Sequence, residues 1–288
     1  IFINRCSNNE VNKMNMWEIF VAVILGLVEG LTEFAPVSST GHMIIVDDIW
    51  LKSNELFGSE VANAFKVVIQ LGSILAVVVL FWGRFMDLLG LRKLKGTSAV
   101  NGPKLNLLQI FVGLLPAGVL GLLFEDYIDE NLFKMKTVIV GLILGALLMI
   151  AADKFRPKMT AETVDQITYK QALGVGLIQC LSLWPGFSRS GSTISGGVLL
   201  GMSYRAASDF TFIMAVPIMA GASLLKIIKY WDIFTPEVLP FFIAGFISAF
   251  IFALFCIRFF LVLINKVKLT PFAIYRIVLA VVLMFIFW

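Results

Sequence analysis

Hydrophobic residues occur along this chain in long stretches that are almost free of charge. Six of these stretches approach or reach the roughly 20 apolar residues that a helix needs to cross the hydrocarbon core of a bilayer. The pattern therefore predicts an all-α fold with six membrane-spanning helices. The predicted spans are about 64–82, 105–123, 136–153, 207–228, 238–263 and 270–288.

Two further apolar regions are each interrupted by a short polar segment that contains proline. Their halves are too short or too polar to cross a bilayer alone. Non-helical backbone at membrane depth is tolerated only where it is buried in protein or lines a cavity. We therefore expect two re-entrant helical hairpins whose tips lie inside the protein. The halves and their breaks are 17–33 and 40–50 around 34–39, and 170–183 and 190–202 around 184–189.

The two hairpin regions match each other at an offset of 150 residues, and Gly113 with Gly245 continues the similarity more weakly. Three spans follow each hairpin, so the second half must enter the membrane in the opposite orientation. This arrangement is the inverted-topology repeat found in many transporters. We expect one repeat at about 17–153 and the other at about 170–288. Matched pairs include Gly26 with Gly176, Glu29 with Gln179, Ser38 with Ser188, and Gly41 with Gly191.

The charged loops alternate in sign along the chain. Cytoplasmic loops of membrane proteins carry an excess of lysine and arginine. The loop after the first span is therefore predicted to be cytoplasmic and the acidic loop after the second to be outside, which places the first hairpin and both termini outside. Lys226 and Lys229 fall outside and do not fit this rule. The basic loop contains Arg84, Arg92, Lys93, Lys95 and Lys104, and the acidic loop contains Glu125, Asp126, Asp129 and Glu130.

The composition agrees with a membrane class. Hydrophobic residues make up 59% of the chain and charged residues 15%, and the mean hydropathy is +0.92. Soluble domains carry about 25% charged residues, so a water-soluble fold is excluded. The net charge of +4 gives no basis for a nucleic-acid partner. Cys6, Cys180 and Cys256 are widely separated, which argues against a disulfide framework or a metal knuckle.

The first 16 residues are polar and differ from the rest of the chain. They lack a basic segment leading into a cleavable apolar core, so they do not resemble a signal peptide. Because the chain begins with Ile1, we expect natural translation to begin at Met14 or Met16. Residues 1–16 are therefore interpreted as a polar extension and residues 17–288 as a single membrane domain.

Glu29 and Glu33 lie four residues apart and so share one face of the first half-helix. Carboxylates at that spacing repel each other, and ionisable groups inside a membrane are usually functional. Protonation of one carboxyl, or a cation between the two, would relieve the repulsion. Mg²⁺ and Ca²⁺ prefer oxygen ligands and can bridge to phosphate, so we expect a divalent cation held by Glu29 and Glu33. A carboxylate buried against backbone donors is the simpler alternative.

Hydroxyl residues follow the first break, in the order Ser38, Ser39, Thr40, Gly41 and His42. Such residues cap a helix whose free N–H groups can bind phosphate. His42 is the single histidine of the chain, which excludes a three-histidine zinc site and a phosphatase that needs two histidines. Its position one turn after the serines favours a catalytic role over a structural one.

The second break supplies positive charge through Arg189. An arginine can bind two phosphate oxygens at once and stays protonated in proteins. An arginine that extends to the membrane interface is the alternative. The residues predicted to bind phosphate are Ser38, Thr40, Ser188, Arg189, Ser190 and Thr193.

Residues 29–42, with the sequence EGLTEFAPVSSTGH, and residues 185–191, with the sequence PGFSRSG, closely resemble the motifs of the bacterial undecaprenyl-diphosphatase family. The resemblance extends to residues 70–73 and 271–276 and covers the chain from about residue 17 onward. Ala35 replaces the leucine that is usual in the family, a change that should not disturb the chemistry.

The resemblance implies an enzyme that hydrolyses undecaprenyl pyrophosphate to undecaprenyl phosphate and inorganic phosphate. That reaction recycles the lipid carrier of peptidoglycan and cell-wall synthesis and confers resistance to bacitracin. The family implies a multi-pass protein of the bacterial cytoplasmic (inner) membrane whose active site opens to the outer, periplasmic face. The expected partners are the bilayer and a polyprenyl pyrophosphate lipid, with no nucleic acid, and a homodimer is one candidate assembly.

For the mechanism, we expect Ser39 to attack the terminal phosphorus with His42 as base and later acid. Arg189, Glu33 and the cation would stabilise the charge of the transition state. Ser38 is the alternative nucleophile, and attack by water activated by His42 is a third possibility. The rival class is a membrane transporter or flippase of a phosphorylated lipid, which shares the repeat architecture. A transporter needs an anion site but no adjacent nucleophile and base.

Overall fold

The structure is a computed structural model that describes residues 15–91, 104–132 and 134–287. These residues form helices and turns without a β-strand, which confirms the predicted all-α class. The extension up to residue 14 and the basic positions Arg92, Lys93 and Lys95 lie outside the described residues. The α-helices are α1 (Met16–Thr32), α2 (Ser39–Met43), α3 (Ser53–Phe57), α4 (Ser59–Leu80), α5 (Trp82–Leu88), α6 (Leu107–Leu123), α7 (Glu125–Asn131), α8 (Met135–Lys154), α9 (Tyr169–Gln179), α10 (Arg189–Leu199), α11 (Tyr204–Lys229), α12 (Leu239–Val267) and α13 (Thr270–Phe287).

Five helices of the described chain, α4, α8, α11, α12 and α13, are long and apolar enough to cross a membrane. They correspond to five of the six predicted spans. The sixth predicted span, 105–123, corresponds to α6, which is apolar but has only 17 residues. The outward side chains are apolar as well, and Phe255, Phe259 and Val262 of α12 are 64–67% exposed. Apolar surface on this scale marks contact with a membrane, so the protein is an integral membrane protein.

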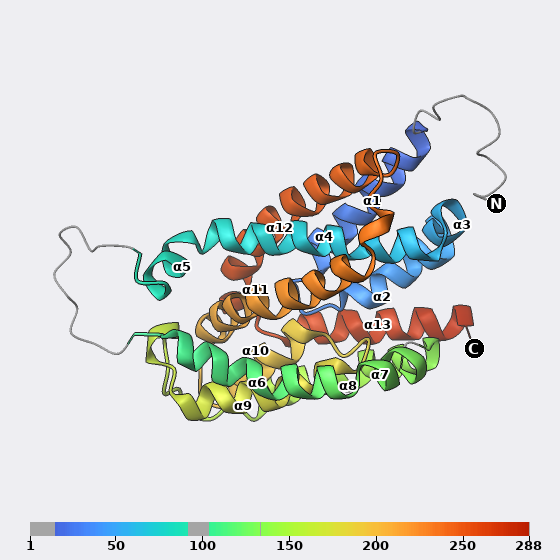
Figure 1. Cartoon of the computed structure of the whole chain (residues 1–288). Helices are drawn as coiled ribbons and strands as arrows, with labels where there is room; N and C mark the ends of the chain where they lie inside the picture. Colours follow the sequence, from blue (N-terminus) through green and yellow to red (C-terminus); the bar gives the residue numbers. More distant parts are fainter. Residues whose placement is uncertain (1–14, 92–103, 133, 288) are drawn as a thin grey trace, which may run out of the picture.

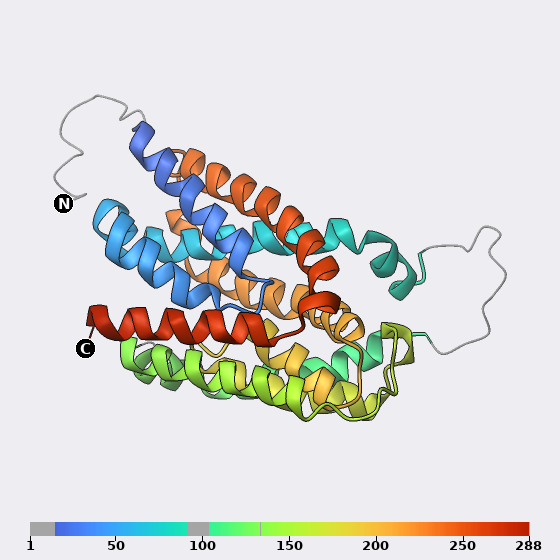
Figure 2. The ribbon, with the colours of Figure 1, turned by 180° about the vertical axis from the view of Figure 1, so that it is seen from behind.

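The long helices run between two ends of the molecule (Figure 1). The start of α1, the helix α7 and the end of α13 lie at one end, which we call the α7 end. The helix α5 lies at the opposite end, which we call the α5 end, and the view from behind shows the same grouping (Figure 2). The acidic residues of α7 and the basic Arg84 of α5 therefore lie at opposite ends, as the charge alternation predicts.

Glycines bring the two halves of the chain into close contact. A Cβ atom at Gly26 of α1 would meet the backbone oxygen of Gly245 in α12. In the same way, a Cβ atom at Gly176 of α9 would meet the backbone oxygen of Gly113 in α6. Small residues allow such close helix packing in membranes. The contacts are reciprocal, since each hairpin packs on a helix of the other half.

The two polar breaks form turns of the same unusual geometry. Ser38 precedes α2 with a φ of 71°, and Ser188 precedes α10 with a φ of 72°. This left-handed region is unfavourable for a residue with a Cβ atom. The Ser38 hydroxyl accepts a hydrogen bond from the Gly41 N–H over 3.5 Å, and Ser188 accepts one from the Gly191 N–H over 3.2 Å. These caps offset part of the backbone strain and fix both tips.

The tips of the two breaks meet inside the molecule. Ser190 Oγ at the second tip donates a hydrogen bond of 3.1 Å to the carbonyl oxygen of Ala35 at the first. Phe34 is fully buried beside this contact, with its ring packed edge-on against Phe212 of α11 at 5.3 Å between ring centroids. Residues more than 150 positions apart in the sequence thus form one site.

Candidate active site

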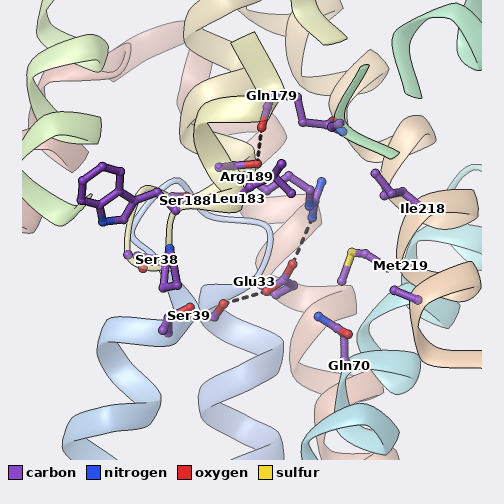
Figure 3. A pocket seen from close by; sticks show the side chains of 17 residues that line it. Glu33, Ser38, Ser39, Gln70, Gln179, Leu183, Ser188, Arg189, Ile218 and Met219 are labelled. Carbon is purple, nitrogen blue, oxygen red and sulfur yellow. Dashed lines mark hydrogen bonds and ion pairs between the residues drawn. The ribbon is translucent and has the colours of Figure 1, made fainter. Parts of the chain in front are cut away.

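A cavity of about 290 Å³ lies where the two tips meet. Both breaks contribute to its wall, together with residues of α4, α6 and α11 (Figure 3). Its polar wall consists of Glu33, Ser38, Ser39, Thr40, Gln70, Gln179, Ser182, Ser188 and Arg189.

Ser39, Glu33 and Arg189 form a continuous chain of polar contacts in this cavity (Figure 3). Ser39 Oγ donates a hydrogen bond of 2.7 Å to Glu33 Oε2, and Arg189 Nη2 donates one of 3.1 Å to Glu33 Oε1. The Glu33 and Arg189 side chains are only 10% and 14% exposed. Charge-assisted hydrogen bonds are strong in such shielded surroundings. Glu33 is therefore placed to accept the proton of Ser39, as a general base must be.

The guanidinium of Arg189 is held from two further sides. Its Nη1 donates to the carbonyl oxygen of Thr211 over 3.4 Å, and its central carbon lies 5.6 Å from the centre of the Phe34 ring. A cation over an aromatic face is attracted by the ring. Because these contacts orient the guanidinium before any ligand arrives, the cavity presents a preorganised cation to an anion.

Three of the hydroxyl residues predicted to bind phosphate line the cavity, namely Ser38, Thr40 and Ser188. The other two, Ser190 and Thr193, are fully buried behind it. Ser190 bonds to the first tip, and Thr193 Oγ1 donates to the carbonyl oxygen of Arg189 over 2.8 Å. These two residues therefore hold the second tip in place and do not belong to the cavity wall.

His42 is held by Ser38 and Tyr275 rather than by Ser39. Its Nδ1 lies 2.8 Å from the carbonyl oxygen of Ser38, and its Nε2 lies 2.6 Å from the hydroxyl of Tyr275. Because a carbonyl oxygen only accepts, Nδ1 is the nitrogen that carries a proton toward Ser38, and Nε2 pairs with the hydroxyl of Tyr275. Both ring nitrogens are thus engaged. Ser39, for which His42 is the base expected from the sequence, donates its hydrogen bond to Glu33 instead.

Glu29 lies one turn before Glu33 on α1 and is 6% exposed. It is close enough to Glu33 and Arg189 to interact with both electrostatically, so Arg189 supplies part of the positive charge that the carboxylates need. Among the described residues, no group of three or more His, Cys, Asp or Glu side chains is placed to enclose a metal ion. A Mg²⁺ or Ca²⁺ ion therefore fits only if oxygens of a bound phosphate complete its coordination, as is common for Mg²⁺.

Gln179 also lines the cavity, although its sequence neighbourhood gave no reason to expect a binding role. It is 2% exposed, and its Nε2 has no hydrogen-bond partner among the described residues. An unpaired buried donor costs about 1–3 kcal/mol, which an acceptor bound in the cavity would remove. The repeat contains the signal that identifies it, since Gln179 corresponds to Glu29 in the other half.

The remaining wall of the cavity is apolar. Ala117 of α6 and Ile218 of α11 line it, and each directly follows a proline inside its helix, Pro116 or Pro217. A proline removes a backbone hydrogen bond and bends a helix. Met219 adds a flexible apolar side chain next to the polar residues. A cavity with an ionic part and an apolar part suits an amphiphilic ligand that carries an anionic group.

The fold and the cavity define an integral membrane protein in which the partly buried Ser39, Glu33 and Arg189 form one polar cluster beside an apolar wall. The family model described as Bacitracin resistance protein BacA matches residues 22–282. The chain therefore belongs to this family, which confirms the resemblance inferred from the two motifs.

Curated relatives match nearly the whole chain, and the three named here are all called undecaprenyl-diphosphatase. The protein of Geobacillus sp. (strain WCH70) is 70% identical over 96% of this chain and 100% of its own length. That of Bacillus subtilis (strain 168) is 66% identical over 95% and 99%, respectively. That of Exiguobacterium sibiricum is 63% identical over 94% and 98%.

Proposed function

We propose that this protein hydrolyses undecaprenyl diphosphate to undecaprenyl phosphate and inorganic phosphate. The reaction recycles the lipid carrier of cell-wall synthesis and underlies resistance to bacitracin. Relatives that carry the name of this activity are 63–70% identical. The structural observation that supports it best is the chain of contacts from Ser39 through Glu33 to Arg189, beside an apolar wall.

In the proposed reaction, Ser39 Oγ attacks the terminal phosphorus while Glu33 Oε2, 2.7 Å away, accepts its proton. The bond between that phosphorus and the bridging oxygen breaks, and undecaprenyl phosphate leaves. Water then attacks the phosphorus of the phosphoserine, and the bond between phosphorus and Ser39 Oγ breaks. The serine oxygen recovers a proton from Glu33, and both hydrogens of the water leave with the inorganic phosphate as H₂PO₄⁻. A serine needs such a neighbouring base because its hydroxyl is a weak nucleophile. His42 positions the reaction by holding the carbonyl group of Ser38, the residue before the nucleophile.

Arg189 stabilises the charge that develops on the phosphoryl oxygens. In the structure its guanidinium is paired with Glu33. When Glu33 takes the proton of Ser39, its negative charge disappears and the guanidinium is released to the phosphate. The proton transfer and the electrostatic stabilisation are thereby coupled. The N-terminal N–H groups of α10 are further donors to an anion in this position.

A divalent cation, Mg²⁺ or Ca²⁺, belongs to the proposal. Glu29 and Glu33 would hold it together with the oxygens of the pyrophosphate. When bound, the ion would neutralise phosphate charge and orient the terminal phosphoryl group. Glu29 does not line the cavity, but it lies one turn of α1 before Glu33, which does.

The proposal also includes the topology. The helix α6 is the sixth span, α1 with α2 and α9 with α10 are re-entrant hairpins, and residues 17–288 form one domain of two inverted repeats. The acidic α7 and the basic residues near α5 support an outward α7 end in the bacterial cytoplasmic membrane. The apolar wall residues Ala117 and Ile218 lie in the halves of α6 and α11 nearer the α7 end, which favours an opening toward the outer face.

Phosphate release from undecaprenyl diphosphate by the purified protein tests the mechanism. Ser39→Ala and Glu33→Gln should each lose at least about 100-fold, within the range for a general base. The double variant should lose little more, because groups that act as one unit are not additive. His42→Ala should lose less, since His42 acts only through Ser38.

Each variant is checked for thermal stability and for a single peak in gel filtration. If Ser39→Ala keeps substantial turnover while Glu33→Gln does not, water is the nucleophile and the serine proposal fails. If both retain turnover, the site lies elsewhere.

A further inference from the structure

A second cavity, of about 550 Å³, lies at the α5 end and shares no lining residue with the active-site cavity. Three arginines line it, namely Arg84 of α5, Arg205 of α11 and Arg258 of α12, together with Asp209. Much of the remaining wall is apolar and includes Phe81. Neither the proposed hydrolysis nor the hairpin motifs account for this concentration of arginine.

Two of the three arginines are neutralised within the chain. Arg84 Nη1 and Nη2 donate to the Asp165 carboxylate over 2.7 and 3.1 Å. Arg205 Nε donates to both oxygens of Asp209 over 3.0 Å, so its two terminal amino groups remain available to another acceptor. Arg258 has no ion-pair partner among the residues that the structure describes. The lining therefore carries one positive charge that this part of the chain does not balance.

Arg258 lies on the lipid-facing side of α12. It is exposed, and its neighbours Phe255, Phe259 and Val262 are 64–67% exposed. The helix continues to Val267, which places Arg258 roughly 13 Å before its end at about 1.5 Å per residue. An unbalanced charge on the lipid-facing side of a membrane helix is unfavourable. A balancing anion is therefore expected from outside the chain, and the bilayer is the nearest source.

We propose that this cavity binds the phosphate group of a membrane lipid at the α5 end. Arg258 and the free amino groups of Arg205 donate to the phosphate oxygens, and the lipid chains lie along the apolar outer face of α12. Basic pockets between membrane helices bind anionic headgroups in this way. A volume of about 550 Å³ falls in the usual range of ligand pockets and accommodates more than a bare phosphate. The site does not depend on the hydrolytic mechanism.

The test is lipid retention by purified wild type and variants, measured by native mass spectrometry. The probes are dioleoylphosphatidylglycerol, which is anionic, dioleoylphosphatidylcholine, which is zwitterionic, and a polyprenyl monophosphate. Wild type should retain phosphatidylglycerol at least about tenfold better than phosphatidylcholine, equivalent to 1.4 kcal/mol. Arg258→Gln should lose that preference. The control Lys266→Gln removes an exposed positive charge from the same helix outside the cavity and should keep it.

The polyprenyl monophosphate distinguishes two sources of the phosphate. If it displaces phosphatidylglycerol from wild type but not from Arg258→Gln, the site takes prenyl lipids. If it does not displace it, the site takes bulk anionic phospholipid. Equal retention of both anionic lipids by wild type and Arg258→Gln would overturn the proposal.

A second variant keeps all three arginines, so its result does not depend on whether Arg258→Gln folds correctly. Val262 lines the cavity and is 64% exposed, so Val262→Cys places a thiol at its entrance. Phosphatidylglycerol should slow the reaction of this thiol with a maleimide severalfold, and phosphatidylcholine should not. No protection by either anionic lipid would also overturn the proposal.

Discussion

The carboxylate of Glu33 is shared between two groups with different tasks. It accepts from Ser39 through one oxygen and from Arg189 through the other. The same carboxylate is therefore both the proton acceptor for Ser39 and half of an ion pair with Arg189. The arginine in turn is kept next to the place where phosphate charge appears. One residue thus links nucleophile activation to charge stabilisation.

The planar guanidinium predicts that lysine cannot replace Arg189. Arg189→Lys keeps the positive charge but loses the planar pair of N–H donors that can bind two phosphate oxygens at once. Such a bidentate pair adds hydrogen bonding of fixed geometry to the Coulomb attraction. Phosphate release should fall at least tenfold, which corresponds to about 1.4 kcal/mol in the barrier. Arg156→Lys, the same change at an exposed site, should leave the rate within twofold. An Arg189→Lys variant with nearly normal turnover would contradict a bidentate role.

The two carboxylates predict dependence on divalent cations. Chelation by excess EDTA should abolish phosphate release, and added Mg²⁺ or Ca²⁺ should restore it. Glu29→Gln should raise the cation concentration needed for half-maximal rate, because one ligand is lost while Glu33 remains. Full activity in EDTA, in a sample shown to contain no divalent cation, would contradict this prediction. Arg189 would then be the group that neutralises the charge of Glu33.

The sequence identifies the residue types of this site more readily than their pairing. Burial of charge made Glu29, Glu33 and Arg189 stand out, because ionisable residues are rare among apolar stretches. The spacing of Ser39 and His42 suggested a shared helix face, yet Ser39 bonds to Glu33. Ser39 is the first residue of α2 and follows a serine with positive φ, so the turn decides the direction of its side chain. Helical spacing does not encode that turn.

At the scale of the helices, the glycine contacts predict a sharp contrast between two similar substitutions. Gly26→Ala places a methyl group against the backbone of α12, whereas Gly118→Ala in α6 meets no atom within 4 Å. Overpacking of this kind costs about 1–3 kcal/mol, so Gly26→Ala should unfold at a lower temperature in detergent. Gly118→Ala should match or exceed wild type, since alanine favours helices. Equal stability of the two variants would mean that α1 and α12 separate easily.

Helix positions were predictable to within a few residues because the apolar stretches are long and the breaks contain proline. Two details were not. The second arm of the first hairpin continues as a π-helix, η2 (Ile44–Leu51), which has no signature in hydrophobic spacing. The reciprocal packing of Gly26 on Gly245 and of Gly176 on Gly113 required the three-dimensional structure. The repeat matched these residues by similarity but does not say which ones touch.

At the scale of the whole molecule, the two ends carry opposite signs of charge. The helix α7 contributes Glu125, Asp126 and Glu130 to one end, and Arg84 and Lys158 belong to the segments at the other. The two cavities follow the same polarity, since the active-site wall extends toward the α7 end and the arginine cavity lies at the α5 end. A substrate that arrives from the outer leaflet therefore requires the α7 end to face outward.

Cysteine labelling in intact cells tests this orientation. In a chain whose native cysteines are replaced, Glu130→Cys and Lys158→Cys place single thiols at exposed positions of the two ends. The positive-inside rule predicts that a membrane-impermeant maleimide labels Glu130→Cys in intact cells and Lys158→Cys only after permeabilisation. Retained phosphate release shows that each variant is folded. The reversed pattern would place the active-site opening on the cytoplasmic face, and the substrate would then have to be drawn from the inner leaflet. A cytosolic control protein in the same cells shows whether the membranes leak, because it is labelled only if they do. In cells whose control protein stays unlabelled, the difference in labelling between Glu130→Cys and Lys158→Cys decides the orientation.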